Sequence, residues 1–329
     1  MGFQLFATNG NETTEISALA RRITWSGDYK TVSRQLSFSL LRTDRDARQP
    51  QVSCETGSVV DFDVDGERVF SGLVLDHSVD TAGTDADNVA YDWGLYLRKN
   101  ETYRKVENAT PEAVVRALAD ECGFRCGSIA ETGIPVSQNF LPGDYYTIIK
   151  TVYELASAKT GVKYQLRFRG QSMDVVEKVL SRESLLLSPG ANLLSVKSRD
   201  VGTGLINRVR IYSTDGTLQD TVEDTDSQAL YGVFQRTISA SGNDDPAAQA
   251  RQLLTDNGLQ TTLTCECLGS LRLLTGNTVV VEEPVTRTYG LFHILSDAHT
   301  WDHGIWWTKI QISLKDLISE AEAKTAASA

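Results

Sequence analysis

The chain has 329 residues, of which 32 are basic and 43 are acidic, so its net charge at neutral pH is −11. That length usually exceeds a single hydrophobic core, so two or more domains are expected. A hydrophobic fraction of 41% excludes wholesale disorder, and the acidic balance disfavours general attraction to nucleic acid or anionic lipid.

Cysteine use and apolar patterning predict a protein made in a reducing cytoplasm. Five cysteines, an odd number in a long chain, do not fit a disulfide framework, so reduced and mostly buried thiols are predicted. No stretch approaches the roughly 18 apolar residues that span a bilayer, and the first residues lack a secretory signal. The cysteines are Cys54, Cys122, Cys126, Cys265 and Cys267.

The first hundred residues are predicted to be β. Apolar and polar residues alternate over 35–40 and over 60–64, which is the pattern of half-buried strands. Asp65 and Gly66 then supply a two-residue hairpin turn, because glycine tolerates the positive φ that such a turn needs. The small, polar and acidic residues 81–88 are predicted to form an exposed loop.

Residues 101–190 are predicted to form a separate α+β module of two helices and a hairpin. Thr110 and Pro111 start a helix that ends near Gly123. A second helix is predicted from Asp144 to Gly161, and alternating residues with a turn at Gly170 then predict a hairpin.

β character returns after residue 190. A helix over 246–257 interrupts it, and strands are predicted over 279–281, 291–295 and 310–314. The tail from Lys315 is rich in alanine and glutamate and predicts a fraying helix. The fold class is thus mainly β with an α+β insert, divided into 1–100, 101–190 and 191–329.

One internal similarity links the two β regions. Residues 56–62 and 275–281 both begin with Thr-Gly and continue into a valine-rich strand. Gly72 follows Gly57 by fifteen residues, and Gly290 follows Gly276 by fourteen. Each segment then enters an apolar strand that carries a histidine, His77 or His293. Either a duplicated β domain or chance between two similar hairpins explains the pattern.

Candidate metal sites are weak. Asp61, Asp63 and Asp65 resemble the start of a calcium loop, but the twelfth position, which needs a bidentate glutamate, is Gly72. An acidic outer face on a hairpin explains these residues better.

The cysteine and histidine spacings also favour structural roles. Cys122 and Cys126, or Cys265 and Cys267, do not have the usual zinc-knuckle spacing, so packing thiols are favoured. His299 and His303 lack an evident third ligand and are predicted to be structural or hydrogen-bonding histidines.

No catalytic or nucleotide-binding motif is complete. The Gly202–Gly204 segment lacks the third glycine of a dinucleotide fingerprint and precedes a strand, so it is predicted to be a turn. Glu282 and Glu283 face opposite sides of a strand and cannot form a hydrolytic pair by themselves. No catalytic, cofactor-binding or metal residue is assigned, although isolated acidic partners elsewhere keep the enzymatic alternative open.

Two further groups have a functional and a structural interpretation. Lys163, Arg167 and Arg169 share one strand face and either bind an acidic partner or form a solvated face, which is the commoner explanation. The tryptophans at 301, 306 and 307 either stack on sugars or, more commonly, bury their rings in a core or interface.

Several short segments, spread over nearly the whole chain, form a recognisable combination by their order and spacing: Ile23 to Gly27, Arg34 to Phe38, Asn207 to Val209, Ser227 to Gly232, Ala250 with Leu253 and Leu254, Leu268 to Thr278-Val279, and His299 to Trp301. This combination resembles the XkdQ/YqbQ-type phage tail hub proteins. Those hub proteins are similar to the central hub of contractile phage baseplates and to the hub part of type VI secretion spikes.

The resemblance implies a structural protein without enzymatic activity or cofactor. It implies two related β-barrel domains, at 1–100 and 191–329, and a homotrimer whose six barrels form a pseudo-sixfold ring. Such a ring joins the tail tube, or a tube-initiator protein, to the spike around a central channel in the virion tail or baseplate. The tape-measure protein and other baseplate proteins are further implied partners, and no membrane is involved.

The insert over 101–190 is expected outside the ring, against other baseplate proteins. An acidic channel lining would let DNA pass without specific binding. Two alternatives stay open: a tail-associated peptidoglycan hydrolase with paired carboxylates or a metal cluster in one cleft, and a carbohydrate-binding β module with exposed tryptophans on one face.

Overall fold

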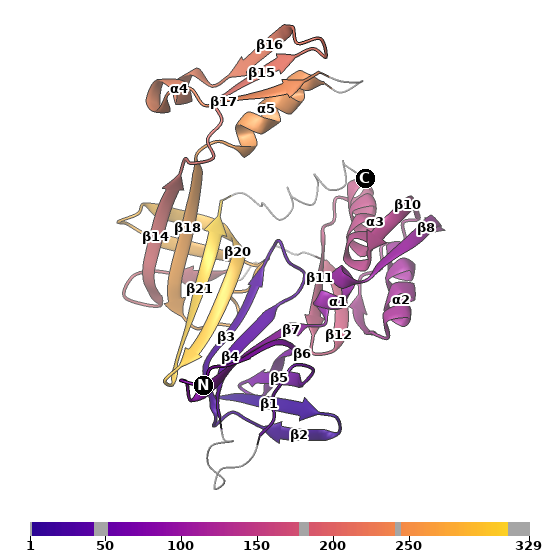
Figure 1. The fold of residues 1–329 in the computed structure, drawn as a ribbon, viewed down its shortest axis with the longest axis vertical. Coiled ribbons are helices and arrows are strands. Elements are labelled where there is room, and N and C mark those ends of the chain that lie inside the picture. Colours follow the sequence, from indigo (N-terminus) through magenta and orange to yellow (C-terminus); the bar gives the residue numbers. More distant parts are fainter. Residues whose placement is uncertain (1, 43–51, 178–183, 241–244, 315–329) are drawn as a thin grey trace. The chain divides into compact units, whose positions relative to one another are not determined.

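The computed structural model describes residues 2–42, 52–177, 184–240 and 245–314, and these residues are mainly β with five helices. The main path of the largest sheet, of thirteen strands in all, runs in the order β14-β18-β21-β20-β3-β4-β7-β6-β5-β1-β2 (Figure 1). Off this path, β19 pairs with β20, and β13 pairs with β19. Its strands are β1 (Phe3–Asn9), β2 (Glu12–Glu15), β3 (Ala20–Asp28), β4 (Gln35–Leu41), β5 (Val59–Val64), β6 (Glu67–Val79), β7 (Asp85–Asp92), β13 (Leu185–Leu187), β14 (Leu193–Val201), β18 (Gln260–Leu268), β19 (Thr278–Glu283), β20 (Thr288–Asp302) and β21 (Ile305–Ser313).

The two halves of this sheet repeat one strand order. In the first half the neighbours run β3-β4-β7-β6-β5-β1, and in the second half they run β14-β18-β21-β20-β19-β13. When the six strands of each half are numbered in chain order, the order in which they lie side by side in the sheet is the same in both halves. One pairing differs, because β1 is antiparallel to β5 whereas β13 is parallel to β19. We call these two sets of strands the first and second repeat.

The two similar sequence segments begin with the same turn. The amide of Ser58 donates to the carbonyl of Glu55 at 2.9 Å, and the amide of Asn277 donates to the carbonyl of Leu274 at 3.0 Å. The glycine before each amide has a positive φ, 97° in the first repeat and 91° in the second. This shared geometry explains why both segments carry glycine at that point.

Backbone pairing also gives the register between the repeats. The amide after the turn threonine bonds to Val74 in the first repeat and to Ile294 in the second, and a β-bulge follows each of these residues. Val74 therefore corresponds to Ile294, and His77 corresponds to Asp297. The two histidines noted in the sequence do not occupy equivalent positions, because His77 lies three residues after Val74 whereas His293 lies one residue before Ile294.

The repeats form one continuous sheet. Strand β20 of the second repeat pairs antiparallel with β3 of the first, from Ser296 opposite Asp28 to Trp301 opposite Ile23. The aromatic core crosses this junction, since the ring of Trp301 lies edge-on to Phe62 at 5.0 Å. Among the described residues no strand pairing closes either repeat into a barrel, which corrects the expected pair of closed barrels.

The hairpin prediction at Asp65 and Gly66 is confirmed, with φ values of 50° and 85°. The loop predicted over 81–88 is wrong in its second half, because β7 begins at Asp85. Alternate side chains of β7 are buried there, and the burial of Ala86 and Asn88 outweighs the polar composition.

The region after β7 contains the predicted helices. Helix α2 (Pro111–Cys122) begins after Thr110 and ends at Gly123, and α3 (Tyr145–Thr160) begins after Asp144, whose side chain accepts the amide of Thr147. The predicted hairpin is β11 (Tyr164–Arg169) with β12 (Ser172–Glu177). The remaining elements, which the sequence patterns did not predict, are α1 (Gly94–Lys99), β8 (Glu101–Ala109), β9 (Arg125–Ile129) and β10 (Val136–Asp144).

By backbone contacts, the chain divides into two compact units, residues 197–264 and the rest. The smaller unit contains a three-stranded sheet, β16 (Leu218–Glu223), β15 (Arg208–Tyr212) and β17 (Gln235–Ser239), together with α4 (Thr225–Tyr231) and α5 (Pro246–Asp256). Its core joins Val209 and Ile211 of β15 to Ala250 of α5. Helix α5 confirms the predicted third helix, whereas the helix predicted from Lys315 lies outside the described residues.

In the part of the chain that the structure describes, no helix combines the length and the apolar character that crossing a membrane requires.

Candidate functional site

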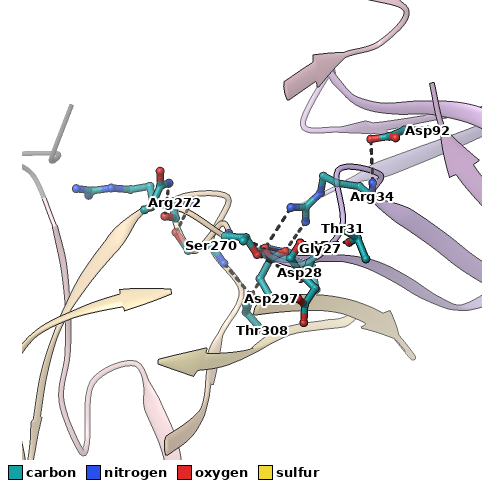
Figure 2. Close-up of polar contacts among 12 residues, drawn as sticks. Gly27, Asp28, Thr31, Arg34, Asp92, Ser270, Arg272, Asp297 and Thr308 are labelled. Atoms are coloured by element: carbon teal, nitrogen blue, oxygen red, sulfur yellow. Dashed lines mark hydrogen bonds and ion pairs between the residues drawn. The ribbon is translucent and has the colours of Figure 1, made fainter. Parts of the chain in front are cut away.

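The most heavily bonded buried charge of the large sheet lies where the two repeats meet. The guanidinium of Arg34, just before β4, approaches the carboxylate of Asp297 on β20 (Figure 2). Nη1 donates to Oδ1 at 3.1 Å and Nη2 donates to Oδ2, so the contact is bidentate. The Asp297 side chain is fully buried, and that of Arg34 is 20% exposed. A bidentate pair of this kind fixes geometry as well as charge.

Further donors surround the Asp297 carboxylate. The amide and the hydroxyl of Thr275 both donate to Oδ1 at 2.6 Å. Burial by itself would raise the pKa of Asp297, but the charge of Arg34 and the hydrogen bonds from His299 and Arg34 lower that pKa far below its ordinary range. Asp297 is therefore a permanent anion that holds the first repeat, the second repeat and the turn before β19 together.

A second buried carboxylate contacts the other end of Arg34. The backbone amide of Arg34 donates to Oδ2 of Asp92 at 3.0 Å, and the amide of Gly94 donates to Oδ1 at 2.9 Å. Burial raises the pKa of Asp92 to about 6, because these hydrogen bonds only partly offset the loss of solvation. Asp92 thus titrates close to neutral pH, unlike Asp297.

The Asp92 carboxyl predicts a pH effect with a definite sign. Its pKa is higher in the folded chain than the ordinary 3.8, so its stabilising contribution is complete below about pH 4 and is lost as the pH rises through about 6. For Asp92→Asn, the free energy of unfolding relative to the wild type should therefore rise by roughly 3 kcal/mol from pH 4 to pH 7. Urea denaturation of both proteins across this range measures the difference, and a flat or falling difference would contradict it.

His299 sits between the buried anion and a threonine. Its Nδ1 lies 3.0 Å from Oγ1 of Thr308, and its Nε2 lies 3.3 Å from Oδ2 of Asp297. The imidazole packs near the ring of Trp25, with 5.4 Å between ring centroids. Aspartate, histidine and a hydroxyl thus stand in the order of a hydrolytic triad. All three side chains are buried, so no substrate reaches the hydroxyl and the row serves to hold the strands.

A cavity of about 530 Å³ lies next to Arg34 in the larger unit. Its lining includes Trp25, Arg34, Lys150 and Glu154 of α3, and Lys163, which precedes β11. Charges of both signs line it, and Lys150 and Glu154 are 3.6 Å apart. The lining selects for no single ligand charge.

The acidic hairpin has the structural role that the sequence favoured. Arg68 on β6 contacts the carboxylates of Asp61, at 2.7 Å, and Asp63. Among the described residues, no three histidine, cysteine, aspartate or glutamate side chains are grouped so that they can hold a metal ion.

The five cysteines are free thiols. Burial raises the pKa of Cys265 and of Cys267 to about 12, so both stay protonated. The Cys267 thiol donates to the carbonyl of Thr308 at 3.3 Å, which makes it part of the packing beside the junction. Cys122 is partly exposed and Cys126 is exposed, on a helix end and the strand that follows it.

The remaining predicted residues do not gather in one site. His303, with its side chain 89% exposed, contacts Asp302 and is not a partner of the buried His299. Gly202 begins a turn, as predicted, because its carbonyl accepts the amide of Leu205. Glu283 accepts the amides of Val285 and Thr286 in the hairpin turn that follows β19.

The basic strand face and the tryptophans are used internally. Arg167 and Arg169 both contact the buried carboxylate of Asp174, at 3.7 and 2.5 Å. The rings of Trp301 and Trp306 stack at 5.0 Å, and Trp307 is half-buried. The core interpretation of these aromatic residues is therefore the better one.

The sequence patterns did not identify three residues of this polar cluster, Asp297, Thr275 and Asp92. One signal was present: Asp297 is in phase with His299 and Trp301 along a strand, so it shares their buried face. Arg34 lies in a segment that carries the family resemblance, but nothing local indicates a partner 263 residues away.

Comparisons with known proteins cover most of the chain. A family model described as YQBQ-like matches residues 23–313. The chain is 24% identical over 255 residues to protein XkdQ of the phage-like element PBSX of Bacillus subtilis, covering 76% of each chain. It is 20% identical over 320 residues to the uncharacterized B. subtilis protein YqbQ, covering 94% of this chain and 96% of the other.

Several solved structures share the fold. The 43 kDa tail protein of prophage MuSo2 from Shewanella oneidensis gives a TM-score of 0.64 at 12% identity, over 94% of this chain and 97% of the other. A tail protein from Neisseria meningitidis gives 0.63 at 15% identity, over 98% and 99%. The E. coli protein c3393, described as a type VI secretion component similar to the T4 tail proteins gp27 and gp5, gives 0.54 at 11% identity, over 97% and 78%.

Proposed function

Because the chain belongs to the YQBQ-like family, we propose that it is a structural tail protein of a phage or phage-like particle and serves as the hub of its baseplate. The tail proteins that share its fold are covered almost from end to end, and so is this chain, which supports an equivalent role for the whole molecule. XkdQ, from a phage-like element, supports the same setting.

The repeated strand order carries the proposal that this hub is a trimer. One chain contributes two copies of a six-strand unit, so three chains contribute six copies. A ring of six similar units with threefold symmetry matches a sixfold tail tube on one side and a threefold spike on the other. The two hub-type domains, at 1–100 and at 191–329, would then surround a central channel.

The other proposed partners follow from this placement. The module over 101–190 would lie outside the ring, against other baseplate proteins. The tube or tube-initiator protein, the spike and the tape-measure protein would meet the ring at its two ends. With the chain at −11, an acidic channel would let DNA pass without specific binding. A strongly basic channel in an assembled ring would contradict this point.

The proposed role is non-enzymatic. The only triad-like row that we find in the described residues, Asp297, His299 and Thr308, is buried and holds the junction. A carbohydrate-binding module would need exposed tryptophans on one face, but all five tryptophans are buried or half-buried. Clearing of purified cell walls by the purified protein would instead favour the hydrolase.

The mass of the purified chain in solution tests the proposal. Light scattering coupled to size exclusion, over a range of concentrations and with tube or spike protein added, should give about 108 kDa, three times the 36.1 kDa chain, or a complex with three copies. A strict monomer that cleaves cell wall would overturn the hub assignment.

A further inference from the structure

The junction within the chain shows how one repeat joins another. Strand β20 pairs with β19 only as far as His293, and it pairs with β21 from His293 to Asp302. Beyond the bulge, the edge that β19 leaves open is taken by β3, opposite Ser296 to Trp301. We call the part of β20 beyond the bulge, Ser296 to Trp301, its extension. In this junction the extension of one repeat pairs with the edge strand of the other repeat.

The first repeat has the same extension, but its edge is open. Strand β6 corresponds to β20, and it pairs with β5 only as far as Leu73. Leu75 lies in the bulge, and from Asp76 to Val79 the strand pairs with β7 on one side, whereas no described residue pairs with its other side. Leu75 and Val79 are 43% and 47% exposed.

The second repeat has the matching open strand. Strand β14 corresponds to β3 and ends the order of the large sheet, with β18 as its single neighbour among the described strands. It is nine residues long, and Leu194 on it is 60% exposed. A long open edge with exposed leucine is normally protected, because unpaired backbone groups invite another strand.

The two open edges are complementary in side chains. Exposed apolar residues occur on both, Leu75 and Val79 on β6 and Leu194 on β14. Strand β14 also carries the exposed cations Lys197 and Arg199, whereas the β6 extension begins and ends beside exposed aspartates, Asp76 and Asp80. The internal junction is likewise held by an arginine and an aspartate, Arg34 and Asp297.

We propose that the open edge of β14 pairs antiparallel with Leu75–Val79 of β6 in the next copy of this chain, repeating between chains the β3–β20 junction found within it. The inference rests on the proposed trimer and names the surfaces that form it. The contact joins two different surfaces, so it is heterologous and closes into a ring after three copies, without a free edge at these strands. Six equivalent junctions, three within and three between chains, then alternate around the ring.

Charge reversal tests the pairing, because these side chains are exposed and their replacement leaves the cores intact. Lys197→Glu/Arg199→Glu and, separately, Asp76→Lys/Asp80→Lys should each raise the concentration for half-assembly by about tenfold or more, since like charges then face each other. The chain with all four changes should recover assembly. Lys105→Glu/Arg125→Glu, which reverses two exposed cations of β8 and β9, is the matched control and should assemble as the wild type does.

Two readouts separate the outcomes. Light scattering gives the mass, and hydrogen exchange gives amide protection at 75–79 and 193–201, which should increase on assembly at the amides that face the open edges. A trimer that forms equally well with the charge-reversed edges, and leaves both edges unprotected, would overturn the strand pairing and leave the hub proposal standing. A wild-type chain that stays monomeric at high concentration and with its tube and spike partners would overturn both.

Discussion

Replacing Arg34 by methionine should lower the free energy of unfolding by about 3–5 kcal/mol, because it leaves the Asp297 carboxylate buried without its main counter-charge. The guanidinium also lies 4.0 Å from the ring of Trp25, so packing at the junction is lost as well. Denaturant unfolding followed by tryptophan fluorescence measures the effect, since Trp25 and Trp301 border the junction.

Arg98 provides a matched control for this change. It contacts Asp144 at 3.1 Å and lies over the ring of Tyr146, but its side chain is 41% exposed. Arg98→Met should cost no more than about 1 kcal/mol. Combining Arg34→Met with Asp297→Asn should cost clearly less than the sum of the single changes, and strict additivity would show that the pair is not coupled.

Replacing Gly269 by alanine should destabilise the chain by about 3 kcal/mol or more. A Cβ at this position would lie 2.1 Å from Cδ2 of Trp306, whose ring stacks on Trp301 at 5.0 Å. The amide of Gly269 also donates to the Trp306 carbonyl at 3.1 Å, so the backbone cannot move away freely. The tryptophan must shift or the strands must part, and either response is costly in a packed core.

Two further variants isolate the cause of that loss. Gly83→Ala places a Cβ no closer than 3.7 Å to its neighbours and should change the unfolding free energy little. In a Trp306→Leu background, the added methyl group of Gly269→Ala should cost much less, because the clashing ring is gone. An undiminished cost in that background would locate the problem in the backbone of residue 269.

The elements that the sequence predicted well carry their signals locally. Helix α2 has a proline at its start and Gly123 at its end, and α3 begins after the capping Asp144, so a short window identifies both. The hairpin at Asp65 needed only its alternating flanks and a glycine. The strand order of the repeats, by contrast, depends on pairings between distant segments that no short window contains.

The junction was unpredictable for the same reason. Arg34 and Asp297 come together only because β3 and β20 pair. They are 263 residues apart in the chain, so no short stretch of sequence around either residue indicates the contact. The first half of β7 was predicted to be a loop because residues 81–88 are small, polar and acidic. The smaller unit over 197–264 was missed since its boundaries fall inside strands β14 and β18 rather than at a proline or glycine.

The pairing of β3 with β20 also sets the order of events during synthesis. The first repeat is complete at Asp92, but its partner strand ends at Asp302, so the ribosome must add 210 further residues before the junction can form. At the usual rate of about 5–20 residues per second, that interval is about 10–40 s. During this interval the edge of β3, with Arg34 beside it, stays unpaired in the nascent chain and is open to other molecules that bind β-strands. A folding factor that shields this edge until the second repeat emerges would raise the yield of the native sheet without changing its stability.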